Sequence, residues 1–267
     1  MKNKIKYIFC INTGRSGSNY LGELFTYADG AISMHEMRPI GHSEEMREFL
    51  KGNHEPMRKL TKKKLNIIND SCPNGEVYIE TSHMFIKGFG WILAEILPHD
   101  EIGVIILNRD KSKIVSSFHS IDSVALTYRG QNWMITPDIE KPLIQPPGFF
   151  GKYRETYALM KLLKLIENKL HGLIKKILPN KKIEQLKIFN RYNFQCLEWY
   201  VDEIHALGEK FQQDHPKITF KSLDLSDLND LKKVEELFEY FGLTAKEGLP
   251  KVVGKPTNLK EKFKQKT

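Results

Sequence analysis

The stretch IKYIFCINTGRSGSNYLGELFTY, residues 5–27, gives the strongest indication of the fold. It opens with a short apolar run and passes through a turn rich in glycine and serine. Apolar residues then recur at helical spacing from Asn19 to Tyr27. A buried strand, a tight loop and a helix in this order form the opening of a nucleotide-binding α/β fold. Such a loop presents backbone N–H groups to an anion, and the helix dipole favours the same ligand.

The rest of the chain continues this alternation of strands and helices. Further strands are predicted at residues 31–34, 77–79, 102–107 and 218–220, and helices at 88–97, 111–121, 152–178, 193–213 and 230–241. A charged helical segment at 43–69 is predicted to be interrupted at Gly52 and Pro56. The run at 102–107 is continuously apolar, as in a central parallel strand that is covered on both faces. The sequence therefore predicts a three-layer α/β fold with a mainly parallel sheet, of the P-loop NTPase-like type.

We expect one domain over residues 1–267, because no shift in composition marks a boundary. Residues 127–151 contain four prolines and are predicted to form a loop that acts as a lid. With the helix that follows, this loop would make an insertion at about residues 127–190. No stretch approaches the length of a membrane span, and we expect a cytoplasmic protein.

The chain carries a formal net charge of +8 and has a sequence pI of about 9.1. This charge suits a phosphate-rich ligand, an anionic membrane surface or nucleic acid. Nucleic acid is not expected as a partner, since no aromatic-interleaved RNA motif or DNA-reading motif is present. The three cysteines are scattered along the chain and indicate neither a disulfide framework nor a zinc site.

The turn at residues 13–19 carries the anion-binding chemistry. Backbone N–H groups, hydroxyls and one arginine converge there, and its members are Thr13, Gly14, Arg15, Ser16, Gly17, Ser18 and Asn19. The turn lacks the Gly-Lys-Ser/Thr ending of an ATP-type P-loop, which argues against ATP hydrolysis.

The run TGRSGSNYL, residues 13–21, resembles the 5′-phosphosulfate-binding loop of sulfotransferases that use 3′-phosphoadenosine 5′-phosphosulfate (PAPS). Arg15 stands at the basic position of that loop, and Asn19 stands where threonine or serine is more common. The resemblance implies transfer of a sulfuryl group from PAPS to an acceptor hydroxyl, with 3′-phosphoadenosine 5′-phosphate (PAP) as product. It implies that residues 13–19 bind the cosubstrate, that Arg15 assists catalysis and that no metal is needed.

A second element of the family is an arginine at the end of a central strand with a serine on the next helix. Both bind the 3′-phosphate of PAPS. Here Arg109 follows the strand at 102–107, and Ser117 lies eight positions later, which is the spacing in the family. Lys255, in the segment VVGKPTN, is similar in place to a basic residue that covers the 3′-phosphate.

The catalytic base has two candidates, Glu36 and His83, each after a predicted strand. Glu36 resembles the glutamate base of the tyrosylprotein and several bacterial branches, with Arg38 assisting. His83 is similar in placement to the histidine of the cytosolic branches, although Glu80 replaces the lysine found there. His35, Arg38, Glu80 and His83 are the expected acceptor-binding residues.

We expect the acceptor to be a small molecule, a carbohydrate or a lipid-linked sugar; a phenol and a peptide tyrosine also stay open, and no oligomeric state is predicted. The resemblance fades at about residues 127–190, so this insertion is expected to bind the acceptor. Apolar residues recur at helical spacing over residues 152–178 among many lysines. This helix packs on the core, meets a membrane or meets the substrate. Two other functions stay open: an ATP-dependent kinase on a degenerate P-loop, and a non-catalytic module that binds nucleotides or nucleic acid.

Overall fold

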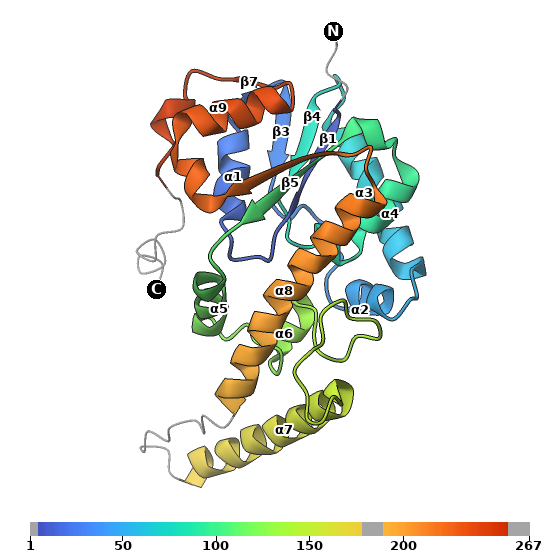
Figure 1. The fold of residues 1–267 in the computed structure, drawn as a ribbon, viewed down its shortest axis with the longest axis vertical. Helices are drawn as coiled ribbons and strands as arrows, with labels where there is room; N and C mark the ends of the chain where they lie inside the picture. Colours follow the sequence, from blue (N-terminus) through green and yellow to red (C-terminus); the bar gives the residue numbers. More distant parts are fainter. Residues whose placement is uncertain (1–4, 178–188, 256–267) are drawn as a thin grey trace. The chain divides into compact units, whose positions relative to one another are not determined.

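The computed structural model describes residues 5–177 and 189–255, and Figure 1 traces the chain. Its contacts define two compact units. The first joins Met1–Asp110 with Leu207–Thr267, and the second is Lys111–Ala206. The second unit contains the segment 127–190 of the predicted insertion, of which residues 178–188 lie outside the described part.

A five-stranded sheet forms the centre of the first unit, and all of its strands are parallel. The strands are β1 (Tyr7–Ile11), β3 (Ala31–Met34), β4 (Val77–Glu80), β5 (Ile102–Asn108) and β6 (Thr219–Asp224), in the order β3-β4-β1-β5-β6. In register, Ile8 of β1 lies between Ile79 and Gly103. The chain leaves β1 toward one side of the sheet and later crosses to β5 on the other side, so β1 is a topological switch point, where open α/β sheets bind ligands.

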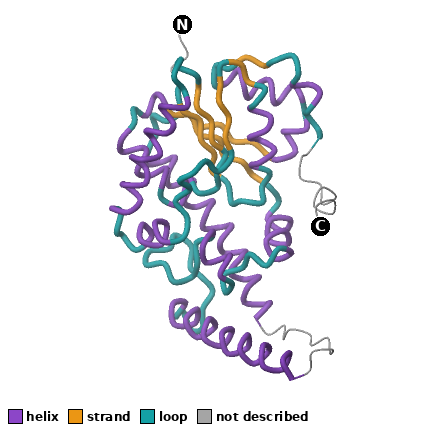
Figure 2. The backbone as a smooth tube through the Cα atoms, turned by 180° about the vertical axis from the view of Figure 1, so that it is seen from behind, coloured by secondary structure: helices purple, strands orange, loops and turns teal. Residues whose placement is uncertain are grey.

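Helices cover both faces of this sheet, which confirms the predicted three-layer α/β architecture (Figure 2). Alternate residues of β1 point to opposite faces. On one face, Ile8 and Cys10 join a core with α1 (Ser18–Phe25) and α9 (Leu231–Tyr240). On the other face, Phe9 stacks on Phe85 with ring centroids 5.0 Å apart, next to α4 (Phe89–Ile96).

The helical segment at 43–69 is two helices, α2 (Glu44–Leu50) and α3 (Glu55–Ser71), which confirms the predicted interruption at Gly52, whose φ of 88° is left-handed. Pro56 lies in the first turn of α3 and does not interrupt it. A small antiparallel ladder of β2 (Ala28–Asp29) and β7 (Thr244–Ala245) was not predicted. Strands of two residues carry too little periodicity to be read from sequence.

The second unit is helical. It comprises α5 (Lys111–Ser120), α6 (Tyr128–Trp133), α7 (Tyr153–Ile177) and the first part of α8 (Asn190–Asp214). The prediction of continuous loop at 127–151 was wrong at α6. The Thr127 hydroxyl accepts a hydrogen bond from the backbone N–H of Gly130 and so caps this short helix. Throughout the described residues, no helix combines the length and the apolar character that crossing a membrane would need.

Candidate functional site

Four predicted site segments follow the carboxyl ends of neighbouring parallel strands. The loop at 12–18 follows β1, Glu36 follows β3, His83 follows β4 and Arg109 follows β5. Carboxyl ends of parallel strands share one edge of a sheet. The fold therefore brings to one edge of the first unit residues that are far apart in the sequence.

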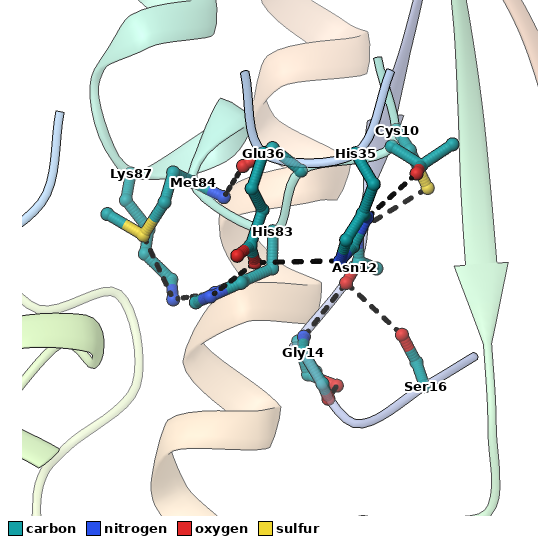
Figure 3. A network of polar contacts seen from close by, with 12 residues as sticks. Cys10, Asn12, Gly14, Ser16, His35, Glu36, His83, Met84 and Lys87 are labelled. Atoms are coloured by element: carbon teal, nitrogen blue, oxygen red, sulfur yellow. Dashed lines mark hydrogen bonds and ion pairs between the residues drawn. The ribbon is translucent and has the colours of Figure 1, made fainter. Parts of the chain in front are cut away.

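Asn12 shapes the loop after β1. Its side-chain Oδ1 accepts hydrogen bonds from the Gly14 N–H at 2.9 Å and the Ser16 hydroxyl at 3.2 Å, while its Nδ2 donates to the Cys10 sulfur (Figure 3). Burial raises the pKa of the Cys10 thiol to about 12, so this sulfur stays protonated and structural. An asparagine at the first position of a turn commonly bonds its own loop in this way.

The loop backbone is left-handed at Gly14, Arg15 and Gly17, with φ of 78°, 56° and 96°. A Cβ atom at Gly17 would lie 2.3 Å from Leu225 Cδ1, so the Leu225 side chain would have to shift, and the φ of 96° favours glycine in any case. Helix α1 begins at Ser18 and has no acidic residue in its first turn. The positive end of its dipole is therefore not offset locally, as an anion site requires.

Arg109 reaches the loop across the sheet edge. Its Nη1 donates a hydrogen bond to the backbone oxygen of Arg15, which joins positions that are 94 residues apart in sequence. Its Nε has no hydrogen-bond partner among the described residues. The guanidinium has five N–H donors in a fixed fork, so donors remain for an anion. Ser117 lies on α5 in the second unit and is partly exposed.

Tyr20 ties the segment that carries Lys255 to the start of α1. Its hydroxyl accepts a hydrogen bond from the Gly254 N–H at 2.7 Å and donates to the Leu228 carbonyl at 3.1 Å. Lys255 itself is exposed. The anchored backbone places this lysine next to an element that begins at the anion-binding loop.

Glu36, His83 and Lys87 form a chain of polar contacts (Figure 3). Glu36 Oε1 lies 3.4 Å from His83 Nε2, and Lys87 Nζ lies 2.7 Å from His83 Nδ1. Lys87 is fully buried, whereas the Glu36 side chain is 27% exposed and can reach a ligand. The backbone of Glu36 is left-handed, with φ of 54°, a conformation that is costly for a residue with a Cβ atom and is often found at functional sites.

Burial sets the protonation of this chain. It lowers the pKa of His83 well below 6.5, with Lys87 and His35 adding repulsion. It also lowers the pKa of Lys87 well below 10.5, against a smaller opposing effect of Glu36. A neutral His83 that accepts at Nδ1 from Lys87 carries its proton on Nε2, facing Glu36. Lys87 therefore positions the imidazole as a donor toward the Glu36 carboxylate.

His35 and the start of α1 hold the neighbouring loop in place. His35 Nδ1 lies 3.0 Å from Thr81 Oγ1, and His35 Nε2 lies 3.9 Å from Glu36 Oε1. A Cβ atom at Gly22 would come within 2.8 Å of Thr81 Oγ1, so glycine permits α1 to approach this strand end. Arg38 is exposed, and within the described residues no ion pair links it to Glu36.

Glu80 lies behind the site rather than in it. Its side chain is 2% exposed and is held by Lys64 Nζ at 2.7 Å and by the Tyr78 hydroxyl at 2.8 Å. Lys64 also donates to the carbonyl of Met37, at 2.9 Å, in the loop that carries Glu36. This burial argues against the predicted contact of Glu80 with an acceptor and gives it a supporting role.

Lys87→Met is expected to change how stability depends on pH. Lys87 in the unfolded chain titrates near 10.5, whereas its pKa in the folded protein is lower. Between these values the unfolded state binds one more proton, so the free energy of unfolding of the wild type rises with pH, by up to about 1.4 kcal/mol per pH unit. Urea denaturation at steps from about pH 7 to about pH 10 should show the wild type gaining stability relative to Lys87→Met in the part of this range above the pKa of Lys87 in the folded protein. A constant difference over the whole range would contradict a lowered pKa of Lys87.

Sequence reasoning missed Asn12, Lys64 and Lys87. The position of Asn12 before a Thr-Gly turn was the available signal for its role. Lys87 lies four residues after His83, but such spacing indicates a contact only where a helical turn is known to connect the two. Nothing local marks Lys64, because its partners Glu80 and Met37 come from distant segments.

Comparisons with protein-family models, with curated proteins and with solved structures found no match. Within residues 5–177 and 189–255, no three His, Cys, Asp or Glu side chains gather as a metal site would require.

Proposed function

We propose that this protein is a PAPS-dependent sulfotransferase on a P-loop NTPase-like α/β fold. The observation that carries the proposal is the contact of Arg109 with the Arg15 carbonyl. It unites the two halves of the cosubstrate motif, the loop for the 5′-phosphosulfate and the arginine for the 3′-phosphate. The exposed Lys255, anchored through Gly254 and Tyr20, adds a third positive charge for the cosubstrate.

Residues 13–19 bind the anionic end of the cosubstrate in this proposal. Their backbone N–H groups and the positive end of α1 stabilise charge that moves to the leaving phosphate oxygen as the sulfur–oxygen bond breaks. Asn12 fixes the loop in advance by its bonds to Gly14 and Ser16, so little reorganisation accompanies binding. Arg15 contributes a fixed positive charge from a left-handed position in the same loop.

Glu36 is the base that accepts the proton of the acceptor hydroxyl. The acceptor oxygen forms a bond to sulfur, the bridging oxygen leaves with PAP, and the hydroxyl proton passes to the Glu36 carboxylate. The Glu36 side chain is more exposed than that of His83, at 27% against 10%, so Glu36 is the better placed of the two to meet the acceptor hydroxyl. Both His83 ring nitrogens also face partners, Lys87 and Glu36, so His83 orients the carboxylate. The acceptor is a carbohydrate, another small molecule or a lipid-linked sugar.

Calorimetric titration with PAP, AMP and ATP tests the cosubstrate class. PAP should bind at least about tenfold more tightly than AMP, because the 3′-phosphate adds charge-assisted hydrogen bonds. Magnesium should not be required for this binding. Tight magnesium-dependent binding of ATP would instead favour the kinase alternative, and binding of oligonucleotides without PAP binding would favour the nucleic-acid module.

Arg109→Ala should weaken binding of PAP by about 10–100-fold and binding of AMP by less than about threefold. AMP lacks the 3′-phosphate, so it reports only on the 5′ loop. Calorimetry measures both affinities, and Arg47→Ala on α2, which removes an exposed arginine elsewhere in the same unit, is the matched control. Equal losses for PAP and AMP would mean that Arg109 supports the loop through Arg15 and does not contact the 3′-phosphate.

A further inference from the structure

Helix α7 exposes a row of large apolar side chains. The row consists of Leu159, Leu162, Leu163, Ile166, Leu170, Leu173 and Ile177, whose exposed fractions run from 41% to 67%. Apart from the adjacent Leu162 and Leu163, they recur every three or four residues, which places the row along one side of the helix. Leucine and isoleucine are usually buried, and a contiguous exposed row of them is typical of a binding surface.

The other side of α7 is the one that packs against its own unit. Tyr157 is buried and donates a hydrogen bond to the Ala125 carbonyl at 2.8 Å. Lys164 pairs with Glu167 at 2.9 Å and lies over the Phe189 ring. Because these residues occupy the inner side, the apolar row points away from the unit. Among the described residues, the apolar row therefore does not follow the first of the three alternatives, packing on the core.

Charge identifies the kind of surface that would cover the row. The helix carries six lysines and arginines against two glutamates, a net charge of +4, within a chain of net charge +8. Lys169 and Lys176 are exposed along the helix. A second copy of α7 would bring like charges together, whereas an anionic surface is complementary. An exposed apolar row with basic flanks is the pattern of a helix that lies in a membrane interface.

We propose that α7 docks this protein on an anionic phospholipid surface, with the apolar row in the acyl boundary and Lys169 and Lys176 near the headgroups. This proposal does not rest on the proposed sulfuryl transfer, since the docking surface uses none of the candidate site residues. Such docking would bring a lipid-linked acceptor to the same surface as the enzyme.

Vesicle co-sedimentation of the full chain tests the proposal. We expect binding to vesicles of phosphatidylcholine with phosphatidylglycerol, little binding to phosphatidylcholine alone, and release as salt rises from about 0.05 M to about 0.5 M. Leu162→Gln with Leu170→Gln should reduce the partition coefficient at least about tenfold. Lys169→Glu with Lys176→Glu should do the same, since each basic residue near the surface adds to binding.

Lys62→Glu with Lys63→Glu on α3 is the matched control, because it changes the net charge equally at two exposed lysines. This control should retain binding within about threefold. If the control lost as much vesicle binding as the α7 variants, the proposal would be overturned, because net charge alone would then explain the attraction to the vesicles. Equal binding to neutral vesicles would also overturn it. So would self-association in sedimentation velocity without vesicle binding, which would assign the row to a second copy of the chain.

Discussion

Glu36→Gln is expected to lower the kcat of sulfuryl transfer by about 10²–10⁴-fold, the usual loss when a general base is removed. Glutamine keeps the size and planarity of the side chain and can still accept a hydrogen bond from His83, so the loop should keep its shape. Its amide oxygen is too weakly basic to take the acceptor proton. The assay follows PAP release from PAPS with an acceptor, found by screening carbohydrates, phenols and lipid-linked sugars, that supports turnover by the wild type.

PAP affinity separates a catalytic role of Glu36 from a structural one. Calorimetry on Glu36→Gln should give an affinity within about twofold of the wild type, because Glu36 contacts the acceptor rather than the cosubstrate in the proposal. His83→Ala should lower kcat by a smaller factor than Glu36→Gln does, since it removes a residue that orients the carboxylate and leaves the base in place. Near-full turnover by Glu36→Gln combined with loss of turnover in His83→Ala would reverse the two roles.

The sequence predicted the core of the fold because its signals are local. The β1–loop–α1 unit follows from an apolar run, a glycine turn and a helical period within residues 5–27. The β5 strand follows from one continuous apolar run, and the structure places it directly beside β1. Once the sheet is parallel, its geometry carries Glu36, His83 and Arg109 to one edge, so the candidate site was accessible from order and spacing.

Other features depend on contacts between distant segments, which periodicity does not encode. Lys87 resembles any lysine in sequence, and only its burial beside His83 makes it part of the site. The pattern at 152–178 correctly predicted an amphipathic helix, which the structure places at Tyr153–Ile177, but amphipathicity does not say which side meets the protein. Here Tyr157 and the Lys164–Glu167 pair occupy the inner side. Packing within the second unit therefore determines which side of α7 faces inward.

Lys64→Met should be among the most destabilising single substitutions in the first unit, at about 3–5 kcal/mol. Lys64 and Glu80 side chains are each 2% exposed and lie 2.7 Å apart. Burial lowers the pKa of Lys64, and its attraction to Glu80 partly restores it. Without Lys64, the Glu80 carboxylate is left buried with no cation, and the Met37 carbonyl loses its donor. Urea denaturation with an unchanged slope against denaturant measures the loss.

The double variant Lys64→Met with Glu80→Gln should recover most of this loss, because a neutral amide needs no buried cation and can still accept from the Tyr78 hydroxyl. A double-mutant cycle with Glu80→Gln alone then isolates the coupling energy of the pair. If the losses of the two single variants simply add in the double variant, the pair does not act as a unit. In that case the cost of Lys64→Met would come from its bond to Met37, and the loop that carries Glu36 would be the part of the molecule that Lys64 stabilises.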